Sequence, residues 1–196
     1  MKKIISVISL MLVIALSFTA CGGKKDYKEN SKEFKFDRLE IDLTESFSEA
    51  RRVEANEDSV TIGDLVTYTS KTFTSVTIQR EQAQAAFILA ANSLKALKTT
   101  KFEKTTLTYV DEDASKTEKT ESGLEYYYYI YTVKESGTEY TFLKAFFNKG
   151  EYSYSITFSA TKAAYDGSKN DDGYKKHFVD WLKTVSITLP ESSEGN

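Results

Sequence analysis

Apolar and polar residues alternate along much of the chain after residue 34, a pattern typical of strands with one buried face. Residues 151–160 are an example, since Tyr152, Tyr154, Ile156 and Phe158 alternate with serine and threonine. The pattern predicts strands at residues 39–43, 65–69, 73–79, 105–110, 124–134, 139–147, 151–160 and 185–189. Turns at Gly137 and Gly150 join three of them into an antiparallel meander, a pattern expected of a sheet with one covered face.

Two segments follow a helical period instead. In residues 81–98 one face is predicted to carry Ala83, Phe87, Ala90, Leu94 and Leu97. Residues 160–173 form a polar loop in this prediction, and a second helix over 174–183 places Tyr174, Phe178 and Trp181 against the sheet. The predicted fold class is therefore α+β, an antiparallel sheet flanked by two main helices.

The first twenty residues have a different organisation. Lys2 and Lys3 precede an apolar run over residues 4–16 that only two serines interrupt. Residues 17–20 are small apart from Phe18, and Cys21 follows. This order is typical of a secretory signal peptide, and the run is shorter than the ~20 residues that span a bilayer.

The segment Phe18-Thr19-Ala20-Cys21 resembles the lipobox of bacterial lipoproteins, although that family prefers leucine where Phe18 stands. The resemblance implies cleavage between Ala20 and Cys21, and acyl chains such as palmitate attached through the Cys21 thiol. It also implies an outer-face location on the cell membrane. The lysine-rich composition resembles that of a precursor from a Gram-positive bacterium. An uncleaved anchor and a plain secreted protein are the alternatives.

These boundaries divide the chain into four parts. Residues 1–20 are the predicted signal peptide and residues 21–33 a polar, flexible tether. Residues 34–190 form a single domain, and residues 191–196 are a polar tail after Pro190.

The order of elements in residues 34–190 resembles the PsbP-like family, whose fold is also seen in the Ran-binding protein Mog1. The resemblance consists of an opening strand at 39–43, a central helix, a triple meander, and a closing helix followed by the strand that holds Ile187. It implies an α/β/α sandwich and carries no catalytic signature.

Charge and cysteine content exclude several classes of protein. Without Lys2 and Lys3 the chain keeps 24 basic residues against 29 acidic ones, which argues against a nucleic-acid partner. Because Cys21 is the single cysteine, neither an internal disulfide nor a cysteine-based metal cluster is possible. We expect no cofactor.

A tyrosine-rich segment is the main candidate for a binding surface. A strand period sends Tyr126, Tyr128 and Ile130 to one face of the sheet and Tyr127, Tyr129 and Tyr131 to the other. One set is expected to pack beneath a helix, while the other packs or lines a ligand surface. His177, with Asp180 three residues further on, is a weaker candidate for catalysis, because exposed helix pairs of this kind are common.

The loop from Asp166 to Gly173 resembles a calcium loop, with candidate oxygen ligands at Asp166, Ser168, Asn170 and Asp172. It departs from the EF-hand form, since Asp171 stands where glycine is needed and His177 where glutamate is needed. A solvated loop is the alternative, and the acidic residues Asp111, Glu112 and Asp113 leave the same two possibilities open.

No P-loop, dinucleotide fingerprint, zinc spacing or nucleophile elbow is present in the sequence. We therefore predict a lipid-anchored extracytoplasmic binding or accessory protein rather than an enzyme. Its expected partners are the membrane, through Cys21, and a component of the cell surface or wall. A surface hydrolase of wall glycans and a calcium- or small-molecule-binding domain are the alternatives.

Overall fold

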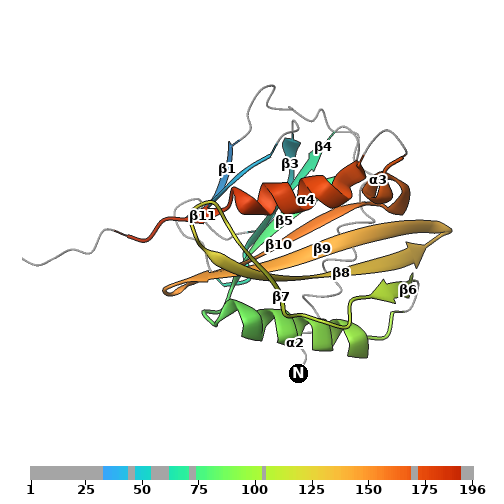
Figure 1. The fold of residues 1–196 in the computed structure, drawn as a ribbon, viewed down its shortest axis with the longest axis horizontal. Coiled ribbons are helices and arrows are strands. Elements are labelled where there is room, and N and C mark those ends of the chain that lie inside the picture. The colour runs from blue at the N-terminus through green and yellow to red at the C-terminus, as the bar shows by residue number, and fades with distance from the viewer. Residues whose placement is uncertain are drawn as a thin grey trace, which may run out of the picture.

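The computed structural model describes residues 33–43, 47–53, 62–70, 74–102, 105–168 and 172–190. These residues form eleven strands and three helices, arranged in two antiparallel sheets (Figure 1). The α+β class predicted from the sequence is confirmed. The predicted signal peptide, Cys21 and the tail after Pro190 lie outside the described residues.

The larger sheet has eight strands and contains the predicted meander. Its order is β3 (Phe47–Val53), β4 (Leu65–Ser70), β5 (Ser75–Glu81), β10 (Tyr152–Thr161), β9 (Thr138–Lys149), β8 (Glu125–Glu135) and β6 (Thr105–Val110). A further strand, β7 (Lys116–Lys119), pairs with β8 beyond the end of β6. Gly137 and Gly150 adopt φ values of 88° and 60° in the turns of the meander, a backbone conformation that glycine adopts without strain.

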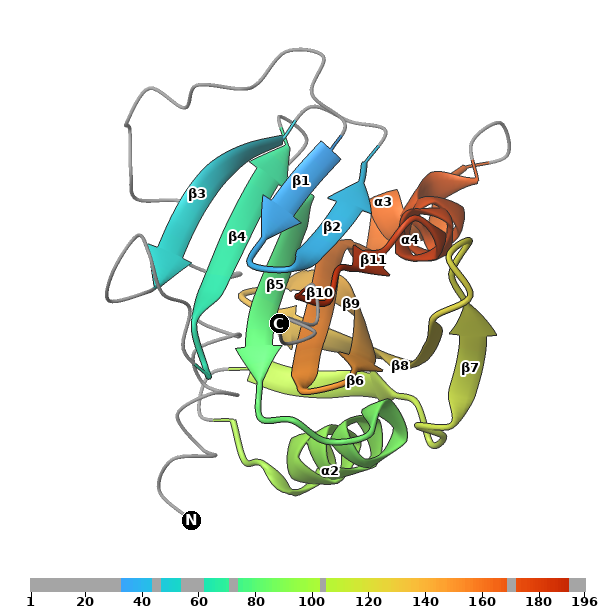
Figure 2. The same cartoon turned by 90° about the vertical axis from the view of Figure 1, so that its left-hand side faces the viewer.

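A second, three-stranded sheet lies across the larger one. It consists of β1 (Glu33–Phe36), β2 (Leu39–Asp42) and β11 (Ser186–Ile187). Figure 2 shows these strands crossing β4, β5 and β10. The predicted strand at 185–189 is shorter than expected, because only Ser186 and Ile187 pair with β2.

Helix α4 (Gly173–Lys183) covers the same face as the small sheet, and the predicted face of this helix is buried as expected. The Phe178 ring stacks on Phe158 of β10 at 4.8 Å, and Trp181 meets Phe47 of β3 at 5.8 Å. The prediction of a loop over 160–173 was wrong in part. Strand β10 runs to Thr161, and a short helix, α3 (Lys162–Asp166), follows because the Thr161 hydroxyl accepts a hydrogen bond from the Ala164 amide.

Helix α2 (Ala86–Thr99) packs on the opposite face, over β8 and β9 (Figure 1). The helix was predicted to begin at residue 81, but pairing of Glu81 with Ser153 extends β5 instead. Ala90, Leu94 and Leu97 are buried as predicted, and Ala86 completes the buried stripe. Phe87 is 53% exposed and Ala83 precedes the helix, against the prediction.

The two faces of the larger sheet are both buried in its centre, against the expectation of one covered face. On β10, Ser153 and Ser155 are buried opposite the aromatic side. Hydrogen bonds offset the burial of these hydroxyls: Ser155 donates to Glu81 Oε1 at 2.6 Å, and Ser75 and Ser159 share a bond of 2.6 Å.

Replacing Phe178 with alanine should lower the free energy of unfolding by about 3–5 kcal/mol, because this fully buried ring leaves a cavity between α4 and β10. The matched change Phe87→Ala should cost less than about 1 kcal/mol, since that ring is largely in water. Urea unfolding of both variants measures the difference, and equal losses would contradict the observed orientation of α2.

Candidate functional site

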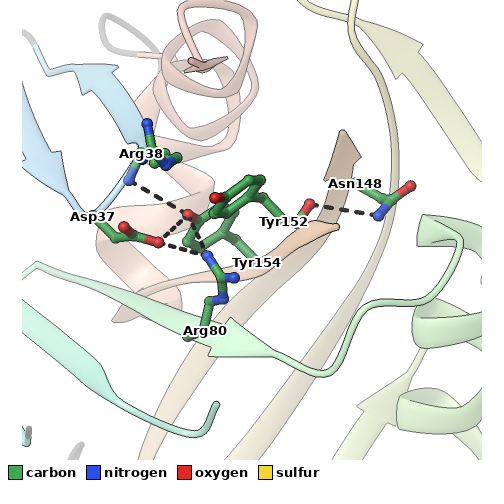
Figure 3. Close-up of polar contacts among 6 residues, drawn as sticks. All are labelled: Asp37, Arg38, Arg80, Asn148, Tyr152 and Tyr154. Carbon is green, nitrogen blue, oxygen red and sulfur yellow. Dashed lines mark hydrogen bonds and ion pairs between the residues drawn. The ribbon is translucent and has the colours of Figure 1, made fainter. Parts of the chain in front are cut away.

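Three polar side chains connect the small sheet to the larger one (Figure 3). Arg80 Nη1 of β5 lies 2.5 Å from Asp37 Oδ2 in the β1–β2 turn and donates to the Tyr154 hydroxyl of β10 at 2.9 Å. That hydroxyl donates to Asp37 Oδ2 at 2.5 Å. Burial and the hydrogen bond to Asp37 raise the pKa of Tyr154, so the phenol remains the donor. We call these three residues the Asp37 joint.

The Tyr152 ring and neighbouring polar groups surround the Asp37 joint. The Arg80 guanidinium carbon lies 4.5 Å from the centre of the Tyr152 ring, and that of Arg38 lies 5.1 Å from the same ring (Figure 3). Asn148 Nδ2 donates to the Tyr152 carbonyl oxygen at 3.4 Å. Only 14% of the Arg80 side chain and 21% of the Asp37 side chain are exposed. The joint therefore acts as a connection between layers rather than as an open site.

Removing the Tyr154 hydroxyl should weaken the joint without opening a cavity. Tyr154→Phe is expected to lower the free energy of unfolding by about 1–3 kcal/mol, because a bond to a partly buried charge is lost. Tyr127→Phe is the matched control, since its hydroxyl bonds Glu125 on the exposed surface, where such bonds contribute little. Urea unfolding compares the two, and an unchanged Tyr154→Phe variant would contradict the structural role.

A second group of polar and aromatic side chains lies where β7 pairs with β8. Lys116 is opposite Tyr128 and Glu118 is opposite Tyr126, so all four side chains share one face. Tyr126 is fully buried, stacks on Phe147 at 5.1 Å, and donates from its hydroxyl to Glu118 Oε2 at 3.3 Å. Tyr128, with its ring centre 6.0 Å from that of Tyr126, is only half-buried.

An ion pair borders the half-buried Tyr128 ring. The Asp111 amide donates to the Ile130 carbonyl oxygen of β8 at 2.8 Å, which places the buried Asp111 carboxylate beside Lys116. Lys116 Nζ donates to Asp111 Oδ2. Burial alone lowers the pKa of Lys116, but the hydrogen bond and charge of Asp111 outweigh it, and the net shift is upward. Lys116 is therefore a cation in this site.

Helices α3 and α4 border the same face. The Tyr165 ring of α3 interacts electrostatically with Tyr128 and Asp111, and Lys183 of α4 interacts with Tyr128. Lys183 Nζ lies 3.2 Å from Asp180 Oδ1. The Glu121 amide after β7 donates to the Lys183 carbonyl oxygen at 2.8 Å, and Figure 2 shows this part of the chain reaching α4.

These contacts define the Tyr128 cluster, which consists of Asp111, Lys116, Glu118, Tyr126, Tyr128 and Tyr165. Among the described residues, the hydroxyls of Tyr128 and Tyr165 have no hydrogen-bond partner. Burial, followed by the charge of Glu118, raises the pKa of Tyr128. The cluster thus combines a half-exposed ring, neutral phenols, a lysine and two carboxylates, which suits recognition of a polar ligand.

The predicted division of the tyrosine run is confirmed. Tyr126, Tyr128 and Ile130 pack with the core beneath α4 and the small sheet, and Tyr127, Tyr129 and Tyr131 pack with the core beneath α2. The face beneath α4 carries the candidate site. The sequence pattern did not reveal Asp111 and Lys116 as members of the site, nor Asp37 and Arg80 as an ion pair. The turn at Gly123 was the available signal for pairing β7 with β8.

His177 and Asp180 do not form a pair in the structure. The His177 ring stacks on Trp181 with 5.9 Å between ring centres and is exposed on its other side. Asp180 binds Lys183 instead. This arrangement lacks the carboxylate-oriented histidine that a general base requires.

Neither predicted calcium loop gathers its carboxylates in the part that the structure describes. Asp166 pairs with Lys162, and Asp172 lies 3.8 Å from Lys176, while Asn170 and Asp171 are outside the described residues. In the other loop Asp111 binds Lys116, Glu112 binds Lys98 at 2.5 Å, and Asp113 accepts from Ser115. No group of three or more histidine, cysteine, aspartate or glutamate side chains among the described residues could hold a metal ion.

Comparison with known proteins yields distant structural likenesses. No protein-family model and no curated protein matches the chain. A crystal structure from Bacteroides thetaiotaomicron is 15% identical over 81% of this chain, with a TM-score of 0.46, and the chain spans about half (49%) of that protein's length. A protein of unknown function from Pseudomonas aeruginosa, described as a putative regulator, is 14% identical over 74% of this chain and 98% of its own, with a TM-score of 0.45. Likenesses this distant carry no argument about function.

Alkaline pH should destabilise the domain through its buried tyrosines. Burial, followed by the charge of Glu49, raises the pKa of Tyr68 to about 12; burial and then Asp166 raise that of Tyr165 to about 12. Between pH 10 and 12 the folded state keeps protons that the unfolded chain releases, so the stabilisation is complete below pH 10 and is lost as pH rises through 12. Urea midpoints measured across this range should fall less steeply for Tyr68→Phe, and parallel curves would contradict the prediction.

Proposed function

We propose that this chain is a lipid-anchored extracytoplasmic binding protein. Residues 1–20 direct export and are removed, and Cys21 becomes the acylated first residue on the outer face of the membrane. The observation that carries this proposal is the segment Phe18-Thr19-Ala20-Cys21 at the end of an apolar run. A thiolate is the nucleophile that accepts a diacylglyceryl group, and two or three acyl chains hold a protein durably where one binds reversibly.

The proposed tether limits how far the domain extends from the membrane. Eleven residues, 22–32, separate Cys21 from the first described residue, Glu33 of β1. Fully extended, they span at most roughly 40 Å. None of the described helices has the length and apolar character needed to cross a bilayer.

For the domain itself we propose a PsbP/Mog1-like α/β/α sandwich. Support comes from the antiparallel meander β8–β9–β10, with α2 packed on one face and α4 on the other. The small sheet β1–β2–β11 shares the α4 face and closes the core on that side.

We propose that the domain binds a cell-surface or wall component and performs no catalysis. The Tyr128 cluster supports binding, because its groups are hydrogen-bond donors, acceptors and rings that hold one another in place. Asp111 is engaged by Lys116 and Glu118 by Tyr126, so neither carboxylate is paired with a nucleophile that it could activate.

The test is the intact mass and location of the protein expressed in a Gram-positive host. The wild type should fractionate with membranes and carry the mass of a chain that begins at an acylated Cys21. Cys21→Ser should lose the lipid mass and should no longer be cut before residue 21. Phe18→Leu is the matched control, since it restores the preferred lipobox residue and should be processed at least as completely.

Recovery of wild-type protein that retains Met1, or that is secreted with an unmodified Cys21, would overturn the proposed anchor.

A further inference from the structure

We propose that the Tyr128 cluster binds an uncharged saccharide, and that its biological ligand is a glycan of the cell surface. This inference rests on the proposed binding function and specifies the ligand class of the same site. It depends on three properties of the cluster: an aromatic ring that is partly exposed, lysines that are each paired with a carboxylate, and phenols that remain neutral.

The aromatic ring comes from Tyr128. Its neighbour Tyr126 is fully buried and fixed by Phe147 behind it and by Glu118 at its hydroxyl. Tyr128 packs against this fixed ring and is itself only partly exposed. A rigidly backed, half-exposed ring offers a flat apolar surface beside polar groups. The C–H face of a sugar ring packs on such a surface while its hydroxyls reach the edge.

The charges select against ionic ligands. Lys116 pairs with Asp111, and Lys183 pairs with Asp180 at 3.2 Å, so each cation is next to an anion. Glu118 adds a further carboxylate. A ligand anion would meet Asp111 and Glu118, and a ligand cation would meet Lys116 and Lys183. Repulsion between the ligand and the groups of like charge lowers its affinity, so the cluster disfavours ionic ligands.

An uncharged polyhydroxyl ligand uses both signs. Its hydroxyls donate to the carboxylates and accept from the lysine ammonium groups and from phenols. The hydroxyls of Tyr128 and Tyr165 have no hydrogen-bond partner in the part of the chain that the structure describes, and they extend this capacity. The upward pKa shifts of both phenols keep them protonated as donors. Every polar group of the cluster therefore has a possible role toward one class of ligand.

Binding is tested on the purified, detergent-solubilised full-length mature protein by titration calorimetry. Three soluble oligosaccharide probes differ in charge: N-acetylglucosamine oligomers are neutral, glucosamine oligomers cationic, and galacturonic acid oligomers anionic. We expect the neutral oligomers to bind at least tenfold more tightly than either charged set. Preference for a charged probe, or no measurable binding of neutral oligomers, would overturn the proposal.

Variants of adjacent tyrosines locate the site. Tyr128→Ala should weaken neutral-oligomer binding at least tenfold, while Tyr127→Ala, one residue away on the opposite face and similarly half-buried, should leave it unchanged. Tyr128→Phe keeps the ring and should lose less than Tyr128→Ala. If Tyr128→Ala does not fold, the site is located by NMR, from the changes in backbone amide chemical shifts of the wild type when oligomer is added. Shifts centred on β7 and β8 support the site, and shifts elsewhere overturn it.

Two further arms separate the source of the glycan and the proposed function. Co-sedimentation with purified wall glycan should follow the same order of variants; binding to soluble oligomers without co-sedimentation would overturn the surface-glycan assignment. The mass of the Cys21 product is independent of these measurements. If the protein is lipidated but binds no sugar, the saccharide proposal is overturned and the proposed anchor stands. If it binds sugar but Cys21 is unmodified, the proposed anchor is overturned and the saccharide proposal stands.

Discussion

The central constraint on this fold is that strands β8 and β9 of the long meander are apolar on both faces. Tyr126 and Phe147 point to one side, and Tyr129 and Phe146 to the other. A sheet with two apolar faces needs cover on both. Helix α2 supplies it on one side. On the other, α4 alone is too narrow for eight strands, and the small sheet β1–β2–β11 extends the cover toward β3.

Helix α4 and the small sheet come from separate parts of the chain, so their position on the larger sheet has to be fixed. The Asp37 joint fixes the small sheet. Apolar contacts such as those of Phe34 and Leu39 hold the small sheet down but are not directional. The Arg80–Asp37 ion pair and the Tyr154 hydroxyl fix the β1–β2 turn against β5 and β10. Partial burial makes this contact depend on all three groups, since removing one leaves a poorly solvated charge.

Sequence reasoning succeeded where local period and turn chemistry determine the structure. Gly137 and Gly150 marked the meander, and period two sorted the tyrosines of β8 correctly. It failed where pairing with a residue distant in the sequence determines the secondary structure. Glu81 joined a strand because Ser153 lies opposite it, and this displaced the start of α2. The predicted strand at 39–43 proved to belong to a second sheet. The four-residue strands β1 and β7 carry too little pattern to detect, and a bulge between Glu49 and Arg51 breaks the alternation of the seven-residue β3. The same limit hid Lys116 and Asp111, because only the pairing of β7 with β8 brings them to Tyr128.

The Tyr128 cluster lies at the margin of the buried face of β8. Along β8, Tyr126 lies beneath neighbouring core residues and is fully buried, while Tyr128, two residues on and facing the same way, is half-buried. An apolar ring at such a margin is tolerated because tyrosine also has a polar tip. The Asp111–Lys116 pair on one side and α3 and α4 on the other then border the remaining surface. The requirement that buries one tyrosine thus leaves the next one partly open, and this is the surface to which we assign a ligand.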